Sequence, residues 1–296
     1  MYSSVKSTAF ALCSFLIIST VSAQDWSEVE IKTTAINGNV YMLEGRGGNI
    51  GVSIGVDGIV IIDDQFAPLS EKILAALKQL SDGPLKYVVN THYHGDHTGG
   101  NENMQQVGAT IVAHKNVRKR LLLPNRQGNV RPVEALPVIT YKTQMSLFIN
   151  GEEVVMVHVD NAHTDGDSLL YFADSNVLHT GDTFFNGRYP YIDLNSGGSV
   201  AGYIAAVKRG MMLVDDETKI IPGHGPVASK ADYMAFLEML EYLHENAMKA
   251  LESGMSEEDF VADEGITAKY DEMGFGSGFI NSERMRQTLY TSLKKD

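Results

Sequence analysis

The stretch THYHGDHTGG, residues 91–100, places three histidines and one aspartate within six consecutive positions. It directly follows an apolar segment, LKYVVN, that has the composition of a buried strand. His92 and His94 are two residues apart at the end of that strand, so we expect both imidazoles to leave the same face. Asp96 and His97 follow after the chain has turned and should point to a neighbouring position. Imidazole and carboxylate suit zinc and related ions, so the stretch predicts a metal site with room for a second ion beside it.

Four ligands from one turn cannot complete two metal sites, so further donors must come from elsewhere in the chain. The sequence offers His163 in NAHTDGD, Asp182 in HTGDTFF and His224 in IIPGHG. Each lies at a strand end or in a loop near glycine, where the backbone can approach a site closely. The remaining histidines lack this clustered spacing, and we expect them not to be ligands: His114, His158, His179 and His244. His179 is close enough to Asp182 to support it indirectly.

The N-terminus has the pattern of a signal peptide. Residues 1–23 contain Lys6, an apolar run over 9–18, and the small-residue sequence VSA at 21–23. A membrane anchor is the alternative, but that run is well short of the ~20 residues needed to cross a bilayer. We therefore expect an exported protein, periplasmic or secreted, whose mature part, residues 24–296, forms a single domain with C-terminal helices. The only cysteine, Cys13, lies in the predicted signal peptide, so the mature chain has no thiol ligand.

The charge balance opposes binding to nucleic acid. The chain has 24 basic and 37 acidic residues, a net charge of −13 that becomes −14 when Lys6 is removed with the signal peptide. Nucleic-acid binding relies on Lys and Arg to neutralise phosphates. No apolar run in the mature chain is long enough to span a membrane. The expected partner is a small-molecule substrate.

The hydrophobic pattern predicts two sheets with helices outside them. Strand-like segments fill residues 29–64, a helix follows over 69–80, and the strands LKYVVNTH and ATIVAH are separated by a turn and followed by a helix over 116–122. The hairpin SLLYFADSNVLHTGD resembles the earlier GVSIGVDGIVIIDD, since both end in an acid, and this suggests a weak internal duplication. Helices are expected near 200–212, at the end of the chain over 280–293, and around an apolar stripe that we assign to the core: Tyr233, Phe236, Leu237, Leu240 and Leu243.

These motifs, in this order from His92 to His224, resemble the metallo-β-lactamase superfamily. The resemblance implies an α+β fold, a four-layer αβ/βα sandwich of mixed sheets with flanking helices, with the site at one edge between the sheets. It also implies that His92, His94 and His163 hold one metal, that Asp96, His97 and His224 hold a second, and that Asp182 bridges them. The expected cofactor is Zn²⁺, two per chain.

Two ions about 3.5–4 Å apart would lower the pKa of a bridging water towards neutrality and supply hydroxide as a nucleophile. The net positive centre would attract anionic substrates and stabilise an oxyanion. Asp96 is the candidate catalytic residue, because its carboxylate could orient the nucleophile or pass a proton. The segment GDTFFNGRYPYID resembles the corresponding part of glyoxalase II, and it makes Arg188 with Tyr189 or Tyr191 candidates for substrate binding. Asn49, in EGRGGNIG, is a further candidate.

The predicted function is hydrolysis of a small carboxylic derivative: an ester, thioester, lactone or β-lactam. The β-lactamase subclass with a cysteine ligand is excluded, since Asp182 stands in that place, although a β-lactamase proper remains an alternative. A second alternative is an oxidoreductase with one iron, similar to the persulfide dioxygenase of the same superfamily. Substrate choice is expected to depend on the loops around residues 45–49, 124–137 and 184–193.

Overall fold

The computed structural model of the chain describes residues 25–124 and 128–294. The predicted signal peptide, residues 1–23, lies outside the described residues. Among the helices of the described part, none combines the length and apolar character needed to cross a membrane.

A seven-stranded sheet comes first along the chain. Its strands lie in sequence order: β1 (Lys32–Asn37), β2 (Val40–Glu44), β3 (Ile50–Gly55), β4 (Gly58–Ile62), β5 (Leu85–Asn90), β6 (Thr110–His114) and β7 (Ile139–Tyr141). The first four strands pair antiparallel as a meander, and β4 to β7 pair in parallel. The sheet is therefore mixed, as expected.

The second sheet has five strands in the order β12 (Lys219–Ile221), β11 (Val177–His179), β10 (Ser168–Phe172), β9 (Glu152–His158) and β8 (Gln144–Ile149). Its β11–β12 pair is parallel and the others are antiparallel. The segment ITYKTQMSLFI is divided between the two sheets. Its first part forms β7, an edge strand of the first sheet, and its second part forms β8, an edge strand of the second.

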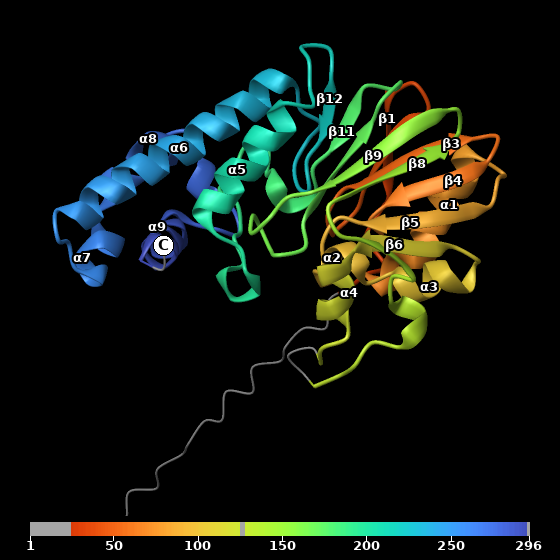
Figure 1. Cartoon of the computed structure of the whole chain (residues 1–296), viewed down its shortest axis with the longest axis horizontal. Coiled ribbons are helices and arrows are strands. Elements are labelled where there is room, and N and C mark those ends of the chain that lie inside the picture. The colour runs from red at the N-terminus through yellow and green to blue at the C-terminus, as the bar shows by residue number, and fades with distance from the viewer. Residues whose placement is uncertain (1–24, 125–127, 295–296) are drawn as a thin grey trace, which may run out of the picture.

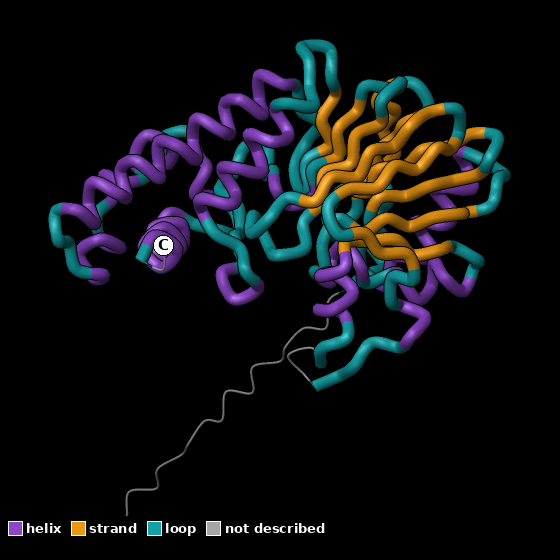
Figure 2. The backbone as a smooth tube through the Cα atoms, viewed as in Figure 1, coloured by secondary structure: helices purple, strands orange, loops and turns teal. Residues whose placement is uncertain are grey.

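The two sheets face each other across a shared apolar core (Figure 2). Successive side chains of a strand point to opposite faces, so each strand supplies alternate residues to this core. On β4, Val60 and Ile62 enter the core between the sheets, whereas Ile59 and Ile61 pack on the outer face. On β10, Leu170 lies between the sheets and Leu169 packs outside. This alternation in both sheets explains why the strands are apolar on both faces.

Helices cover the outer face of each sheet (Figure 1). The helices that follow the first strands are α1 (Ser70–Leu80), α2 (Gly95–Thr98), α3 (Asn101–Gln106) and α4 (Lys115–Leu121). Those of the second half are α5 (Val200–Met211), α6 (Lys230–Glu252), α7 (Glu257–Ala262), α8 (Ala268–Asp271) and α9 (Ser282–Leu293). Short 3₁₀ turns occupy Ala67–Leu69, Val133–Ala135, Gly181–Thr183, Leu194–Ser196, Glu264–Ile266 and Phe275–Ser277. The expected four-layer αβ/βα sandwich is confirmed.

The long helix α6 joins the C-terminal helices to the second sheet. It begins with a capping box, in which Ser229 accepts from the Asp232 backbone amide and the Asp232 side chain accepts from the Ser229 amide. All five residues of the predicted apolar stripe are buried, as expected for a core-facing surface. The same apolar cluster contains Leu178 of β11 and Leu289 of α9. We propose that residues 24–296 form one domain, because this cluster joins the C-terminal helices to the second sheet and another apolar cluster joins the second sheet to the first.

The strand directions bring several chain segments to one edge of the sandwich. β4, β5 and β6 are parallel, so the residues after their last positions meet at the same edge of the first sheet. β11 and β12 are parallel as well, and the isolated bridge between Phe185 and His224 shows that the segments after them stay side by side. The motif at 91–100 therefore faces segments delivered by the second sheet.

Leu240→Ala should lower the free energy of unfolding by about 2–5 kcal/mol, because Leu240 is 1% exposed in the core under α6 and its truncation leaves a cavity. Met234→Ala is the matched control, since Met234 lies on the same helix and is 40% exposed; its change should stay within about 0.5 kcal/mol. Urea denaturation of both variants measures the difference. Equal urea midpoints for the two variants would contradict the packing of this face of α6 in the core.

Candidate metal centre

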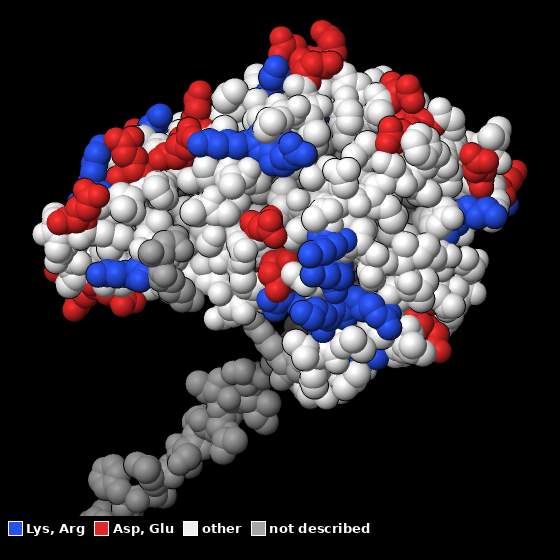
Figure 3. Space-filling model, viewed as in Figure 1, with Lys and Arg blue, Asp and Glu red and all other residues white. Residues whose placement is uncertain are grey.

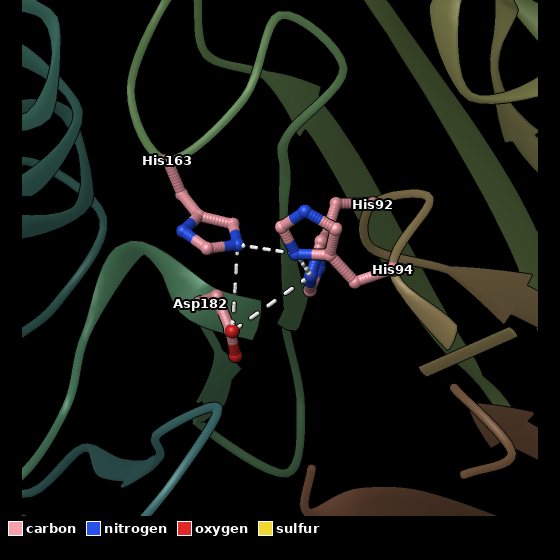
Figure 4. A group of neighbouring side chains, drawn as sticks. All are labelled: His92, His94, His163 and Asp182. Carbon is pink, nitrogen blue, oxygen red and sulfur yellow. Dashed lines mark hydrogen bonds and ion pairs between the residues drawn. The ribbon is translucent and has the colours of Figure 1, made fainter. Parts of the chain in front are cut away.

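Three imidazoles and one carboxylate form the first cluster (Figure 4). His163 Nε2 lies 2.8 Å and His92 Nε2 lies 3.1 Å from His94 Nδ1. Asp182 Oδ2 is 3.5 Å from His163 Nε2 and 3.7 Å from His92 Nε2. Ligands held at about 2.0–2.1 Å around a tetrahedral ion are separated by roughly 3.3 Å, so these spacings match a site for one ion.

The partners of these imidazoles determine which nitrogen carries the proton. The Thr91 hydroxyl donates to Asp63, so it accepts from His92 Nδ1 at 3.0 Å. The Asp193 carboxylate accepts from His94 Nε2 at 3.0 Å, and the Tyr191 carbonyl accepts from His163 Nδ1 at 2.7 Å. Each histidine consequently turns an unprotonated nitrogen towards the other two. Three lone pairs at such short separations form no hydrogen bond among themselves, and a cation would satisfy all of them.

The second cluster consists of Asp96, His97 and His224. Asp96 Oδ2 is 3.4 Å from His224 Nε2 and 3.8 Å from His97 Nε2. His97 Nδ1 donates to Asp63 Oδ2 at 2.7 Å, which directs Nε2 into the cluster. Asp96 and His224 are partly exposed, so this cluster opens towards solvent.

Asp182 connects the two clusters. Its Oδ2 faces the first cluster, and its Oδ1 lies 3.1 Å from His97 Nε2 and 3.4 Å from His224 Nε2. Asp182 Oδ1 and His97 Nε2 are both buried and make no hydrogen bond within the described residues. Buried polar atoms without partners are costly. Their mutual placement fits a carboxylate that bridges two metal ions, so the donor set fits the metals of the expected family.

The pKa values of the site residues reflect its crowded charges. Burial lowers the pKa of His163 to about 4, which favours the neutral imidazole that metals require. Burial alone would also lower the pKa of His97, but the carboxylates of Asp182 and Asp63 outweigh it and raise that pKa well above its ordinary range. Burial would raise the pKa of Asp182, yet the facing imidazoles hold it well below its usual value. The buried carboxylates thus favour positive charge on the imidazoles that face them. Bound metal ions would supply this positive charge instead.

Two glycines let the backbone approach the site. A Cβ on Gly48 would lie 2.0 Å from His97 Cε1, and one on Gly223 would lie 2.1 Å from Asp182 Oδ1. No larger residue fits at either position without displacing a predicted ligand. Asp63 itself has a φ of 66°, a left-handed conformation that is uncommon for residues other than glycine. Its carboxylate accepts from the Thr91 amide at 2.8 Å, which fixes the start of the motif.

A cavity of about 930 Å³ opens beside the clusters. The predicted ligands that line it are His94, Asp96, Asp182 and His224. Among the predicted substrate residues, Arg188, Tyr189 and Tyr191 line it as well. Asn49 does not, because its buried amide donates to the carbonyls of Pro222 and Gly225 at 2.9 Å each. Asn49 instead anchors the turn that carries His224, a geometry that does not favour a substrate contact.

The four remaining histidines lie outside both clusters. His179 has the supporting position expected of it, since Nδ1 accepts from the Gly181 amide at 3.1 Å, next to Asp182. Burial lowers its pKa to about 4. His114 and His158 stack on each other with ring centroids 3.6 Å apart.

Sequence reasoning did not identify Asp63 and Asp193 as partners of the ligands. Asp63 directly follows β4, the parallel neighbour of β5, so its position at the same sheet edge was a usable signal. Asp193 offered no comparable signal, because it reaches His94 from a loop 99 residues later in the chain. Tyr203 was also missed, although its buried hydroxyl donates to the Asp182 carbonyl at 2.5 Å.

The sequence profile of the Metallo-beta-lactamase superfamily matches residues 33–224. The chain therefore belongs to the metallo-β-lactamase superfamily. It is 23% identical over 260 residues to the 2,4-dinitroanisole O-demethylase subunit alpha of Nocardioides sp., covering 87% of this chain and 76% of that protein. It is 26% identical over 212 residues to a hydroxyacylglutathione hydrolase of Polaromonas sp., covering 71% of this chain and 73% of that one.

Solved structures show the same fold. A metallo-β-lactamase from Pontibacter korlensis superposes with a TM-score of 0.61 at 19% identity, covering 72% of this chain and 99% of that one. The sec-alkylsulfatase Pisa1 from Pseudomonas sp. superposes with a TM-score of 0.69 at 16% identity, covering 88% of this chain and 50% of that one. Family membership and the His and Asp clusters identify the protein as a metal-dependent hydrolase.

Gly223→Ala should reduce the bound metal, because the new Cβ would collide with Asp182 Oδ1 and with the backbone of Gly181. Gly95→Ala is the control within the motif itself, since a Cβ there meets no atom within 4 Å. Metal content by mass spectrometry, with folding checked by circular dichroism, compares the two variants. A folded Gly223→Ala protein with unchanged metal content would contradict this role of Asp182.

Asp193→Asn should weaken the binding of one ion about 10–100-fold, because an amide no longer fixes the His94 tautomer as a carboxylate does. Zinc titration against a competing chelator reports the affinity of each site. Asp160→Asn is the control, since Asp160 is an exposed aspartate that pairs with the non-ligand His158. Unchanged affinities in Asp193→Asn would show that His94 is oriented by other contacts.

Proposed function

We propose that the protein is an exported, dinuclear zinc hydrolase that cleaves a small carboxylic derivative: an ester, thioester, lactone or β-lactam. One observation carries the proposal: imidazole nitrogens of both clusters converge on the two oxygens of Asp182, one oxygen facing each cluster. His92, His94 and His163 would hold the first ion and Asp96, His97 and His224 the second, with Asp182 between them. Export rests on the sequence of residues 1–23.

The bound zinc ions would supply an activated water at ordinary pH and polarise the carbonyl under attack. The protein's own contribution is to hold the metal-ligand side chains in position and to keep most of them out of solvent. His92, His97 and His163 are fully buried, so their nitrogens are fixed in place before substrate arrives. His94, Asp96 and His224 line the cavity, so the reacting carbonyl would approach from that side.

Asp96 is suited to proton transfer. Burial would raise the pKa of its carboxyl, but His97 and His224 outweigh that effect and lower it, so the group is a carboxylate at neutral pH. Its side chain is 28% exposed and borders the cavity. We propose that Asp96 accepts the proton of the attacking water and delivers it to the leaving group, which balances the hydrolysis.

Several of the similar proteins support a carboxylic substrate, although an O-demethylase and alkylsulfatases also resemble the chain. Several similar proteins are hydroxyacylglutathione hydrolases, whose name describes cleavage of an acyl thioester. The Tyr191 ring lies 5.9 Å from that of His94 and 5.7 Å from that of His163, so it forms an aromatic wall next to the proposed first ion. A cavity of about 930 Å³ accommodates a small organic molecule.

Purified protein should hydrolyse at least one member of a panel containing a p-nitrophenyl ester, an acyl thioester, a lactone and a chromogenic cephalosporin. His94→Ala and Asp182→Asn should each lower kcat/KM about 100-fold or more, because each removes a donor from a site that acts as a unit. His244→Ala is the control, since that histidine lies on α6 outside both clusters.

Full hydrolysis by His94→Ala or Asp182→Asn would contradict the proposed centre. Oxygen consumption with a persulfide, together with no hydrolysis of any panel member, would instead assign the protein to the iron-dependent oxidoreductases of the superfamily.

A further inference from the structure

Two arginines line the cavity without a carboxylate partner. Within residues 25–124 and 128–294, the Arg188 guanidinium makes no hydrogen bond and no ion pair, and its side chain is exposed. Arg284 donates to the Phe279 carbonyl at 2.9 Å, and its guanidinium carbon lies 4.5 Å from the centre of the Phe279 ring. Arg284 forms no ion pair within the same residues. Both guanidinium groups thus keep most of their donors free.

The other arginines of the cavity are already engaged. Arg120 pairs with Asp165 at 2.5 Å and lies over the Tyr93 ring. Arg131 donates to the Thr98 carbonyl at 2.8 Å, is only partly exposed, and interacts electrostatically with the buried carboxyl of Asp64. The uncompensated charge of the cavity is therefore concentrated on Arg188 and Arg284, in a protein whose net charge is −13. Figure 3 shows further basic side chains gathered over α4, beside the residues Arg120 and Leu121 that line the same cavity.

The two arginines come from different segments that the fold holds together. Arg188 follows the Asp182 loop, whereas Arg284 lies in the first turn of α9. A Cβ on Gly278 would lie 3.9 Å from the Cβ and Cδ atoms of Arg188, so the segment before α9 packs along the stem of that arginine. The Tyr189 hydroxyl donates to Asp271 of α8 at 2.7 Å, and the Ser282 hydroxyl of α9 donates to the same carboxylate at 2.5 Å, which links the segment of Arg188 to α9.

Apolar side chains line the cavity together with these arginines. Leu123 is 61% exposed and Phe279 is 71% exposed, so both offer apolar surface to a molecule in the cavity. Ile280 and Phe185 add buried apolar surface to the lining. A substrate that fills this space would combine an apolar body with an anionic group.

We propose that Arg188 and Arg284 bind a terminal oxyanion of the substrate, such as a carboxylate, at the end away from the bond that is cleaved. Guanidinium groups recognise oxyanions through paired, charge-assisted hydrogen bonds. The substrate class is therefore an acyl derivative with an apolar spacer and a distal anionic group; this assignment rests on the proposed hydrolytic function. The arginines are specificity residues and take no part in bond cleavage.

The first test compares p-nitrophenyl monoesters of the dicarboxylic acids from succinate to suberate with the p-nitrophenyl esters of monocarboxylic acids of equal length. The zinc-loaded wild type should favour the anionic ester at the best length by about tenfold or more in kcat/KM. Arg188→Gln and Arg284→Gln should each reduce this ratio severalfold. Arg209→Gln, an exposed arginine on α5 with the same change of charge, should leave the ratio unchanged. A wild-type ratio near one, or a ratio that survives both substitutions, would overturn the proposal.

The second test separates this proposal from the hydrolytic one. Calorimetry compares the stable amide adipic acid monoanilide with hexananilide, which lacks the carboxylate. The wild type should bind the acid about tenfold more tightly, and both arginine variants should lose the difference. If no ester is hydrolysed but this difference is present, the hydrolytic function fails and the anion site stands. If esters are hydrolysed but the two amides bind equally, the anion site fails and the hydrolytic function stands.

Discussion

The structure depends on imidazole lone pairs held at distances where they repel each other unless a cation lies between them. One nitrogen of each histidine donates a hydrogen bond to a neighbouring group, so the opposite nitrogen faces the cluster. The accepting groups are Thr91, Asp193, Asp63 and the Tyr191 carbonyl. Asp182 then presents one oxygen to each group of ligands. This arrangement of ligands is unfavourable in free energy unless metal ions occupy the two clusters. Metal binding and folding of this edge of the sandwich should therefore depend on each other.

The sandwich provides this arrangement through strand direction. Parallel strands β4 and β5 end at the same edge, so the acid that follows β4 meets the histidines that follow β5. The two hairpins that resemble each other in sequence end in Asp63–Asp64 and in Asp182, and they deliver Asp63 and Asp182 to His97 from two different sheets. Short β12 adds His224 next to the Asp182 loop. The layers therefore bring together ligands that are up to 132 residues apart in sequence, from His92 to His224.

The layered fold and the candidate ligands could be predicted from the sequence, because each ligand follows an apolar strand or lies beside glycine. The partners of the ligands could not, since Asp193 and Tyr203 reach the site only through tertiary packing. Asn49 shows the opposite case. Its place in a glycine-rich turn suggested a substrate contact, but its side-chain amide donates to two backbone carbonyls instead. The helical tail was predicted over 280–293, but only the structure brings Arg284 to the cavity.

The metal content of the protein, purified without added metal and measured by mass spectrometry, tests the central claim most directly. We predict about two zinc ions per chain, because two groups of ligands share the Asp182 carboxylate. One iron per chain with no zinc would contradict the dinuclear zinc centre and with it the proposed hydrolytic chemistry.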